Sequence, residues 1–244
     1  IKAKSTFPVG KVLFLGKGDQ MDRFKKEIEG FQNQINQWQK KYPQWGESIV
    51  FNEDLLKLNP SEVRFILVGD NPGKEEQKAK RYLIGTAGQG ARRFFEETAH
   101  LVDSFDRQVM VLNKTPFFTP STMDLGELSE VEALLEESQK YMAQLMVRFQ
   151  QILGCPLWVT GFGGCRNAKG DWNFKTAKSR PLAPFFKALR EEIEKSKVAD
   201  DKLGFFKHFS YAHFQKDIHR NGIPTDYLQS LSEIGSDYKI NFSD

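Results

Sequence analysis

One short stretch constrains the fold more than any other part of this 244-residue chain. Residues 63–68 form a nearly continuous apolar run, and Gly69-Asp70-Asn71-Pro72-Gly73 follows it directly. Such runs are typical of strands in parallel sheets that helices cover on both faces. Glycine frees the backbone and proline fixes its own φ, so a sharply defined turn should end the strand. Because α/β proteins place their chemistry just beyond such strand ends, we expect Asp70 and Asn71 to be catalytic groups.

Strand and helix patterns alternate along the rest of the chain. Apolar or β-branched runs predict strands at 64–68, 109–113, 156–160 and 205–211. Between these runs, apolar residues recur at three- and four-residue spacing, which predicts helices. Strands separated by helices pair in parallel, so we predict a three-layer α/β/α sandwich around a central, mainly parallel four-stranded sheet.

The beginning of the chain has a different pattern. From Gln20 to Tyr42, apolar residues at helical spacing alternate with Gln, Asn and charged residues, which predicts an amphipathic helix. We expect residues 1–60 to form a helical lead-in packed on a main α/β domain of residues 61–244. A partner-binding arm is the alternative.

The bulk composition sets mild limits on function. A net charge of +3 is compatible with a polyanionic partner but does not require one. Cys155 and Cys165 are too few for a disulfide framework, so we expect reduced thiols, with one disulfide as the alternative. No histidines have the helical spacing of a metal site, and no apolar run is long enough to span a membrane. We therefore expect a cytoplasmic protein with no metal.

Two further polar residues are predicted at the edge of the sheet where Asp70 lies. Asn113 ends the strand at 109–113, and an Asn amide can read a planar amide edge such as that of a pyrimidine. The alternative is an ordinary turn-capping Asn. His213 follows the predicted last strand, although a lone histidine is more often structural than catalytic.

A glycine-rich segment and its basic neighbours suit an anion. Residues 85–90 precede a helix whose first turn carries Arg92 and Arg93, and free amides at a helix start attract negative charge. Arg81 lies shortly before this segment. The alternatives are close chain packing for the glycines and a solvated face for the charges.

Five segments together resemble the uracil-DNA glycosylase superfamily, in the right order over roughly residues 62 to 220. The segments are Gly69-Asp70-Asn71-Pro72-Gly73, Arg81-Tyr82-Leu83-Ile84-Gly85-Thr86-Ala87-Gly88-Gln89, Leu112-Asn113-Lys114-Thr115-Pro116, Trp158-Val159-Thr160-Gly161 and Tyr211-Ala212-His213-Phe214-Gln215. The second segment is similar to one in the iron–sulfur branch, but two cysteines cannot hold that cluster, so a divergent member without a cofactor is indicated. The last segment stands where the family has His-Pro-Ser.

The resemblance implies a monofunctional DNA glycosylase that flips a deaminated base, uracil or hypoxanthine, out of DNA and hydrolyses its N-glycosidic bond without a metal. We expect this protein to be a monomer with DNA as its partner. The implied catalytic residues are Asp70, Asn71 and His213. The implied base-binding residues are Gly69, Pro72, Gly73, Asn113, and Tyr82 or Leu83 over the base face. The implied DNA contacts are Arg81, Arg92, Arg93 and Gln215.

Two other functions stay open at this point. The changed last motif fits a catalytically inactive glycosylase-fold protein that binds nucleic acid or a nucleotide. A small-molecule α/β hydrolase is a weaker alternative, because no Gly-x-Ser-x-Gly elbow is present.

Overall fold

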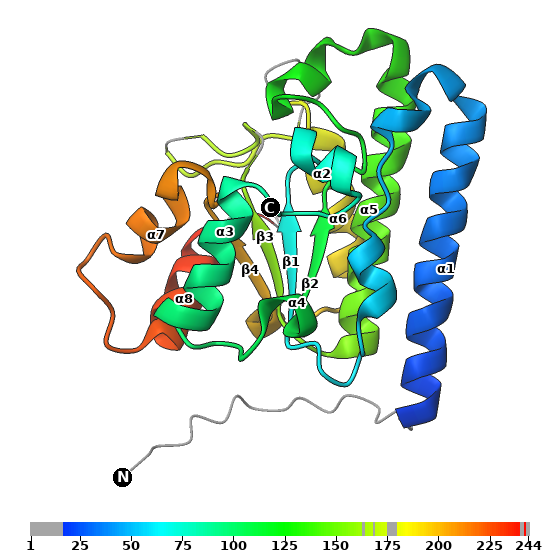
Figure 1. The fold of residues 1–244 in the computed structure, drawn as a ribbon. Coiled ribbons are helices and arrows are strands. Elements are labelled where there is room, and N and C mark those ends of the chain that lie inside the picture. Colours follow the sequence, from blue (N-terminus) through cyan, green and yellow to red (C-terminus); the bar gives the residue numbers. More distant parts are fainter. Residues whose placement is uncertain (1–16, 163, 168, 175–179, 240–241, 243–244) are drawn as a thin grey trace.

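The computed structural model describes residues 17–162, 164–167, 169–174, 180–239 and 242, and it confirms the α/β fold (Figure 1). At its centre lies a four-stranded, all-parallel sheet in the order β2-β1-β3-β4. The strands are β1 (Phe65–Gly69), β2 (Val109–Asn113), β3 (Leu157–Thr160) and β4 (Leu203–Phe206). Every residue of the four strands is buried, as expected of a sheet covered on both faces.

Helices cover both faces of the sheet and make the three layers of the sandwich. On one side lie α5 (Glu132–Leu153) and α6 (Ala183–Ser196), and α3 (Thr86–Arg93) and α8 (Tyr227–Asp237) lie on the other (Figure 1). The remaining helices are α1 (Lys17–Lys41), α2 (Lys74–Ala79), α4 (Phe105–Gln108) and α7 (His213–Ile218), with a π-helical turn η3 (Phe94–Thr98). Short 3₁₀ turns are η1 (Pro43–Ser48), η2 (Glu53–Lys57), η4 (Thr122–Glu127), η5 (Ser129–Val131), η6 (Asp200–Lys202) and η7 (Ser210–Ala212).

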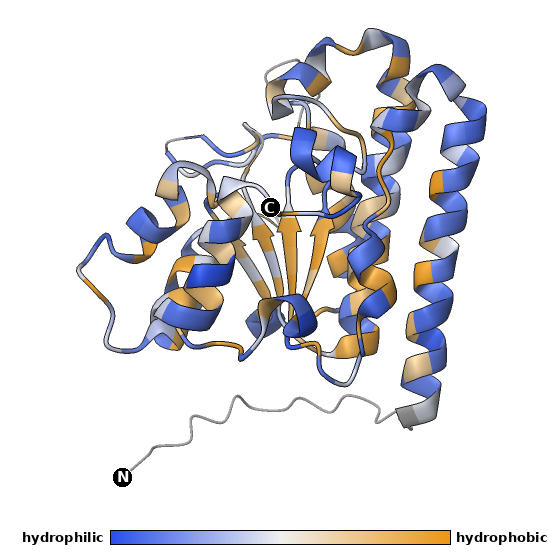
Figure 2. Cartoon of the chain, in the orientation of Figure 1, coloured by the Kyte–Doolittle hydropathy of each residue, from blue (hydrophilic) through white to orange (hydrophobic). Residues whose placement is uncertain are grey.

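Helix α1 packs antiparallel on the outer side of α5. The Phe24 and Phe149 rings are 5.5 Å apart, and the indole Nε1 of Trp38 donates to Glu137 at 2.8 Å. The apolar stripe expected of the lead-in is buried, while the rest of the helix is polar (Figure 2). In the part of the chain that the structure describes, no helix is both long and apolar enough to cross a membrane.

The strand register aligns the ends of β1 and β2. Gly69 of β1 pairs with Asn113 of β2, so the next residues, Asp70 and Lys114, leave the sheet side by side. Because all four strands run in parallel, their carboxyl ends meet at this one edge.

The last strand differs from its prediction. The sequence pattern placed it at 205–211, but β4 spans Leu203–Phe206. After Phe206 the backbone leaves the sheet, and the residues at 210–212 form η7 instead. Tyr211 and Ala212 there have left-handed φ angles of 52° and 56°. The strand therefore ends five residues earlier than predicted, which changes the histidine that follows it most closely.

Substitution of two glycines of α3 should change stability in opposite directions. A Cβ at Gly88 would lie 1.7 Å from the carbonyl oxygen of Leu83, whereas a Cβ at Gly90 would meet nothing within 4 Å. We expect Gly88→Ala to lower the free energy of unfolding by about 2 kcal/mol or more, because backbone must move. Gly90→Ala should raise it by about 0.5–1 kcal/mol through helix propensity. Urea unfolding measures both, and equal effects would contradict the packing of α3 on Leu83.

Candidate active site

A buried ion pair ties together the carboxyl ends of three strands. The Nζ of Lys114 lies 2.5 Å from Oδ1 of Asp70 and also donates to the Thr160 carbonyl at 2.5 Å and the Gly69 carbonyl at 3.3 Å. The Lys114 side chain is fully buried, and the Asp70 side chain is 18% exposed. A lysine can be buried in this way only because each N–H finds an acceptor.

This pair keeps Asp70 ionised. Burial disfavours the carboxylate, but the charges of Lys114 and His208 and the Lys114 hydrogen bond outweigh it and lower the pKa of Asp70 below its ordinary value. Burial also lowers the pKa of Lys114, and Asp70 acts against that shift. The site therefore presents a negative carboxylate at neutral pH, with part of it open to solvent.

The carboxylate fits because the third strand is followed by glycine. A Cβ on Gly161 would lie 2.6 Å from Oδ1 of Asp70, and the φ angle of Gly161 is +79°. Any other residue would both clash with the carboxylate and strain the backbone. The end of β3 and the side chain of Asp70 are thus matched to each other.

Asn113 presents an amide donor without a partner. Its side chain is buried, with 2% exposed, and its Nδ2 has no hydrogen-bond partner among the described residues. Its Oδ1 occupies the space beside Gly69, where a Cβ would lie 2.6 Å away. An unsatisfied buried donor costs about 1–3 kcal/mol, so such a group in a folded protein calls for a ligand acceptor.

The side chain of Asn71 forms hydrogen bonds with a neighbouring segment of the same chain, residues 119–122. Its Nδ2 donates to the Thr119 hydroxyl at 2.9 Å, and its Oδ1 accepts from the Thr122 hydroxyl at 2.8 Å. Pro72 beside it is buried, and the Gly73 N–H donates to Glu76 at 2.7 Å at the start of α2. The turn thus anchors η4 and α2, and Asp70 is its more available polar group.

Histidine 208 lies in electrostatic contact with Asp70, at the second position after β4. Its Nδ1 accepts the Ser210 backbone N–H at 3.1 Å, so the proton of the neutral ring is on Nε2. Burial lowers the pKa of His208, and Asp70 acts against that shift. His208 is therefore a neutral donor at pH 7.

His213 lies close enough to His208 for its charge to lower the pKa of His208. It begins α7, its side chain is exposed, and its ring lies 6.0 Å from that of Tyr211. The prediction of His213 rested on a strand that continued to Tyr211. Because β4 ends at Phe206, His208 takes the place beside the strand ends.

Tyr82 is turned toward the N-terminal part of the chain. Its ring is buried and its hydroxyl donates to the Val50 carbonyl at 2.5 Å, and burial raises the pKa of the phenol. Leu83 is also buried, has a left-handed φ of 53°, and its carbonyl accepts from Arg92 at 2.7 Å. Both side chains are therefore packed inside the protein, with Tyr82 1% and Leu83 5% exposed.

The basic residues predicted to contact DNA divide into two groups. Arg81 pairs with Asp54 at 2.6 Å, and Arg92 pairs with Asp106 at 2.6 Å, so acidic partners already balance their charges. Arg93 is exposed and forms no ion pair with the described residues. Gln215 lies half-buried on α7.

Comparisons with known proteins do not assign the chain to a family: no family model matches it, and no curated protein has a matching sequence. Among the described residues, no three His, Cys, Asp or Glu side chains gather in a way that could hold a metal ion. The side chains of Cys155 and Cys165 are both buried. The sequence analysis did not single out Lys114 or His208. Lys114 directly follows a predicted strand, whereas His208 lay inside one and has a serine two residues after it.

Removing one partner of the buried ion pair should lower the free energy of unfolding. We expect Lys114→Met to lower the free energy of unfolding by about 3 kcal/mol at pH 7, because Asp70 would remain as a buried unpaired charge. Adding Asp70→Asn to Lys114→Met should restore most of the loss. Urea unfolding of the wild type, both single variants and the double variant measures the coupling.

The same variants predict a pH dependence. In the wild type the pKa of Asp70 lies below 3.8, so the pair contributes its stability above that pH and loses it as the pH falls further. The gap between the wild type and Lys114→Met should therefore shrink as the pH falls through this range. A gap that stays constant down to the acid transition would contradict an ionised Asp70.

Proposed function

We propose that the chain is a DNA glycosylase that hydrolyses the N-glycosidic bond of a deaminated base, uracil or hypoxanthine. The observation that carries the proposal is the partnerless, buried amide of Asn113 at the same sheet edge as the ionised carboxylate of Asp70. An amide donor that lacks an acceptor matches the carbonyl oxygen of a base, and a carboxylate matches a sugar that becomes positively charged.

The proposed chemistry divides between the two sides of the bond. As the bond breaks, positive charge develops on the sugar and negative charge on the leaving base. Asp70 stabilises the sugar cation and orients the attacking water, and His208 Nε2–H donates to the base oxygen that becomes negative. Lys114 takes no covalent part, because its ammonium already donates to Asp70, Thr160 and Gly69.

The family resemblance supports these roles with one revision. His208-Phe209-Ser210 carries His and Ser at the spacing of the family's His-Pro-Ser, so the base-oxygen role moves from His213 to His208. The strand that precedes it ends at Phe206, which leaves His208 close to the other strand ends. Asn71 becomes a positioning residue for the 119–122 segment.

The exposed turn that follows His208 is the part of this edge that would contact DNA. Tyr211 is 85% exposed, and its left-handed backbone holds it outward in η7. Exposed aromatic side chains stack on bases at about 1–3 kcal/mol each, which offsets part of the cost of flipping a nucleotide. Tyr211 and Arg93 are therefore the proposed contacts to the strand that carries the damaged base.

A catalytically inactive nucleic-acid-binding protein is the second candidate. It is favoured by Asn71, whose amide is hydrogen-bonded to Thr119 and Thr122 rather than directed toward Asp70. The two candidates share the fold and the residues at the carboxyl edge of the sheet, so only an assay of bond cleavage separates them.

The assay uses labelled oligonucleotides that carry uracil or hypoxanthine, single- and double-stranded, followed by alkali to break abasic sites. We expect cleavage by the wild type and a fall of about 100-fold or more in Asp70→Asn and in His208→Ala, because each loses transition-state stabilisation. His100→Ala, at an exposed histidine that lines a cavity near the amino ends of the strands, is the matched control and should keep most of the activity.

Two outcomes would count against the proposal. Cleavage that survives in Asp70→Asn would show that another group acts. No cleavage of any substrate by folded wild-type protein, together with retained DNA binding, would favour the inactive binding protein.

A further inference from the structure

A cavity lies between the strands and α8, mainly toward the amino ends of the strands, and its lining does not include Asp70, Asn113 or His208. It has a volume of about 320 Å³ and is lined by residues that precede β1, β3 and β4, together with one face of α8. Arg64 comes directly before β1, and Lys202 directly before β4. With about 3.3 Å per strand residue, the two ends of each strand are on the order of 15 Å apart, so most of this cavity lies apart from the proposed active site.

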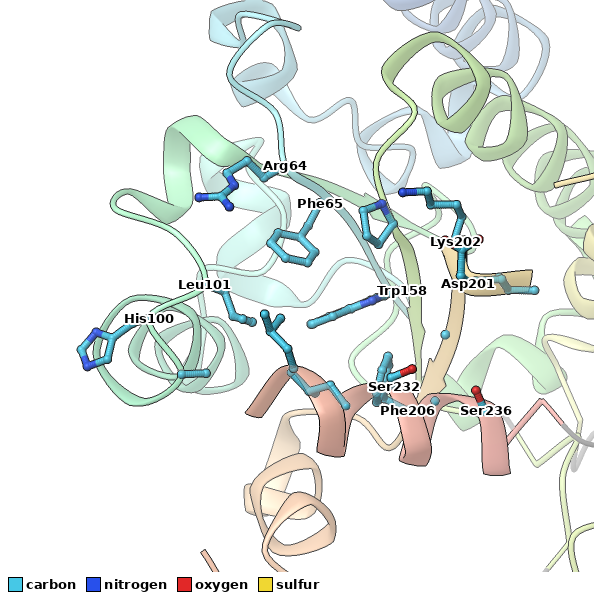
Figure 3. A pocket seen from close by; sticks show the side chains of 17 residues that line it. Arg64, Phe65, His100, Leu101, Trp158, Asp201, Lys202, Phe206, Ser232 and Ser236 are labelled. Atoms are coloured by element: carbon cyan, nitrogen blue, oxygen red, sulfur yellow. The ribbon is translucent and has the colours of Figure 1, made fainter. Parts of the chain in front are cut away.

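The floor of the cavity is aromatic. Phe65, Trp158 and Phe206 line it, with ring centroids 4.8 Å apart for Phe65 and Trp158 and 5.0 Å apart for Trp158 and Phe206. Figure 3 shows these rings between the strands and the helix that carries Ser232 and Ser236. A flat apolar molecule would replace water over these rings.

The cavity does not result from loose packing of α8. A Cβ at Gly235 would lie 2.9 Å from the Phe206 ring and 3.2 Å from the Gly204 Cα, so helix and strand already touch at that point. The helix cannot move closer to close the space. The exposed serines of α8, Ser232 and Ser236, keep the opening clear of large side chains.

The charged groups around the cavity are Arg64, Lys202 and Asp201. The side chain of Trp158 is 7% exposed, and it lines the cavity. In Figure 3 its indole nitrogen points toward the side where Lys202 and Asp201 lie. Neither Lys202 nor Arg64 forms an ion pair in the part of the chain that the structure describes. With Asp201 as the acidic lining residue, the two cations leave a net positive opening.

We propose that this cavity binds a small organic anion with a flat apolar body of one or two rings. The rings would lie against Trp158 and Phe206, and an anionic oxygen would accept from Trp158 Nε1 and pair with Lys202. The volume agrees with this size, because a cavity of about 150 Å³ already holds benzene. The site is independent of the proposed glycosylase chemistry.

Isothermal titration of the whole chain with naphthoate tests the proposal, with naphthalenemethanol as a neutral ligand of the same shape. We expect one naphthoate per chain and clearly weaker binding of the alcohol. Lys202→Ala should weaken naphthoate binding about fivefold, as for a half-exposed ion pair. Trp158→Phe keeps the ring but removes the N–H, and should weaken binding about threefold.

Two further variants separate the cavity from general surface charge. Ser232→Phe, at an exposed position of α8, should block the opening and abolish binding while the melting temperature stays close to that of the wild type. Lys187→Ala removes an exposed cation of α6 outside the cavity and should change nothing. The proposal is overturned if naphthoate does not bind at millimolar concentration, or if it binds Ser232→Phe as well as the wild type.

Discussion

The ion pair between Asp70 and Lys114 is the contact on which the carboxyl edge of the sheet depends. One ammonium reaches the carboxylate after β1 and the carbonyls that end β1 and β3, and it does so from the residue after β2. Apolar residues in place of a buried pair are often neutral or stabilising, so stability alone does not require it. We interpret the pair as a means of keeping a carboxylate ionised where a substrate can reach it.

Two glycines make room for this arrangement. Gly161 leaves space for the Asp70 carboxylate, and Gly69 leaves space for the Asn113 amide. Both end strands, so the sheet itself fixes the distance between the acidic group and the amide donor. Glycines also allow close packing beside the aromatic cavity. There Gly204 of β4 and Gly235 of α8 let the helix lie directly against the strand.

Much of the fold could be predicted because buried parallel strands leave a clear apolar signal. The second strand was predicted with its observed bounds, 109–113, and a mainly parallel four-stranded sheet was predicted from the alternation of strands and helices. The fourth strand was misplaced because Phe209 and Tyr211 continue an alternation that the backbone does not follow. The predicted strand therefore ran past His208, and His213 followed it. The sequence gives no sign that Lys114 is buried, because its partners Asp70 and Thr160 are distant in the sequence and lie at the ends of other strands.

The most direct test of the proposed chemistry is a crystal structure of the Asp70→Asn variant with a single-stranded oligonucleotide that carries uracil. We predict a flipped uracil at the carboxyl edge of the sheet, with a carbonyl oxygen accepting from Asn113 Nδ2 and His208 Nε2 facing the base. A bound strand whose uracil lies outside this edge, with Asn113 Nδ2 still unpartnered, would contradict the account.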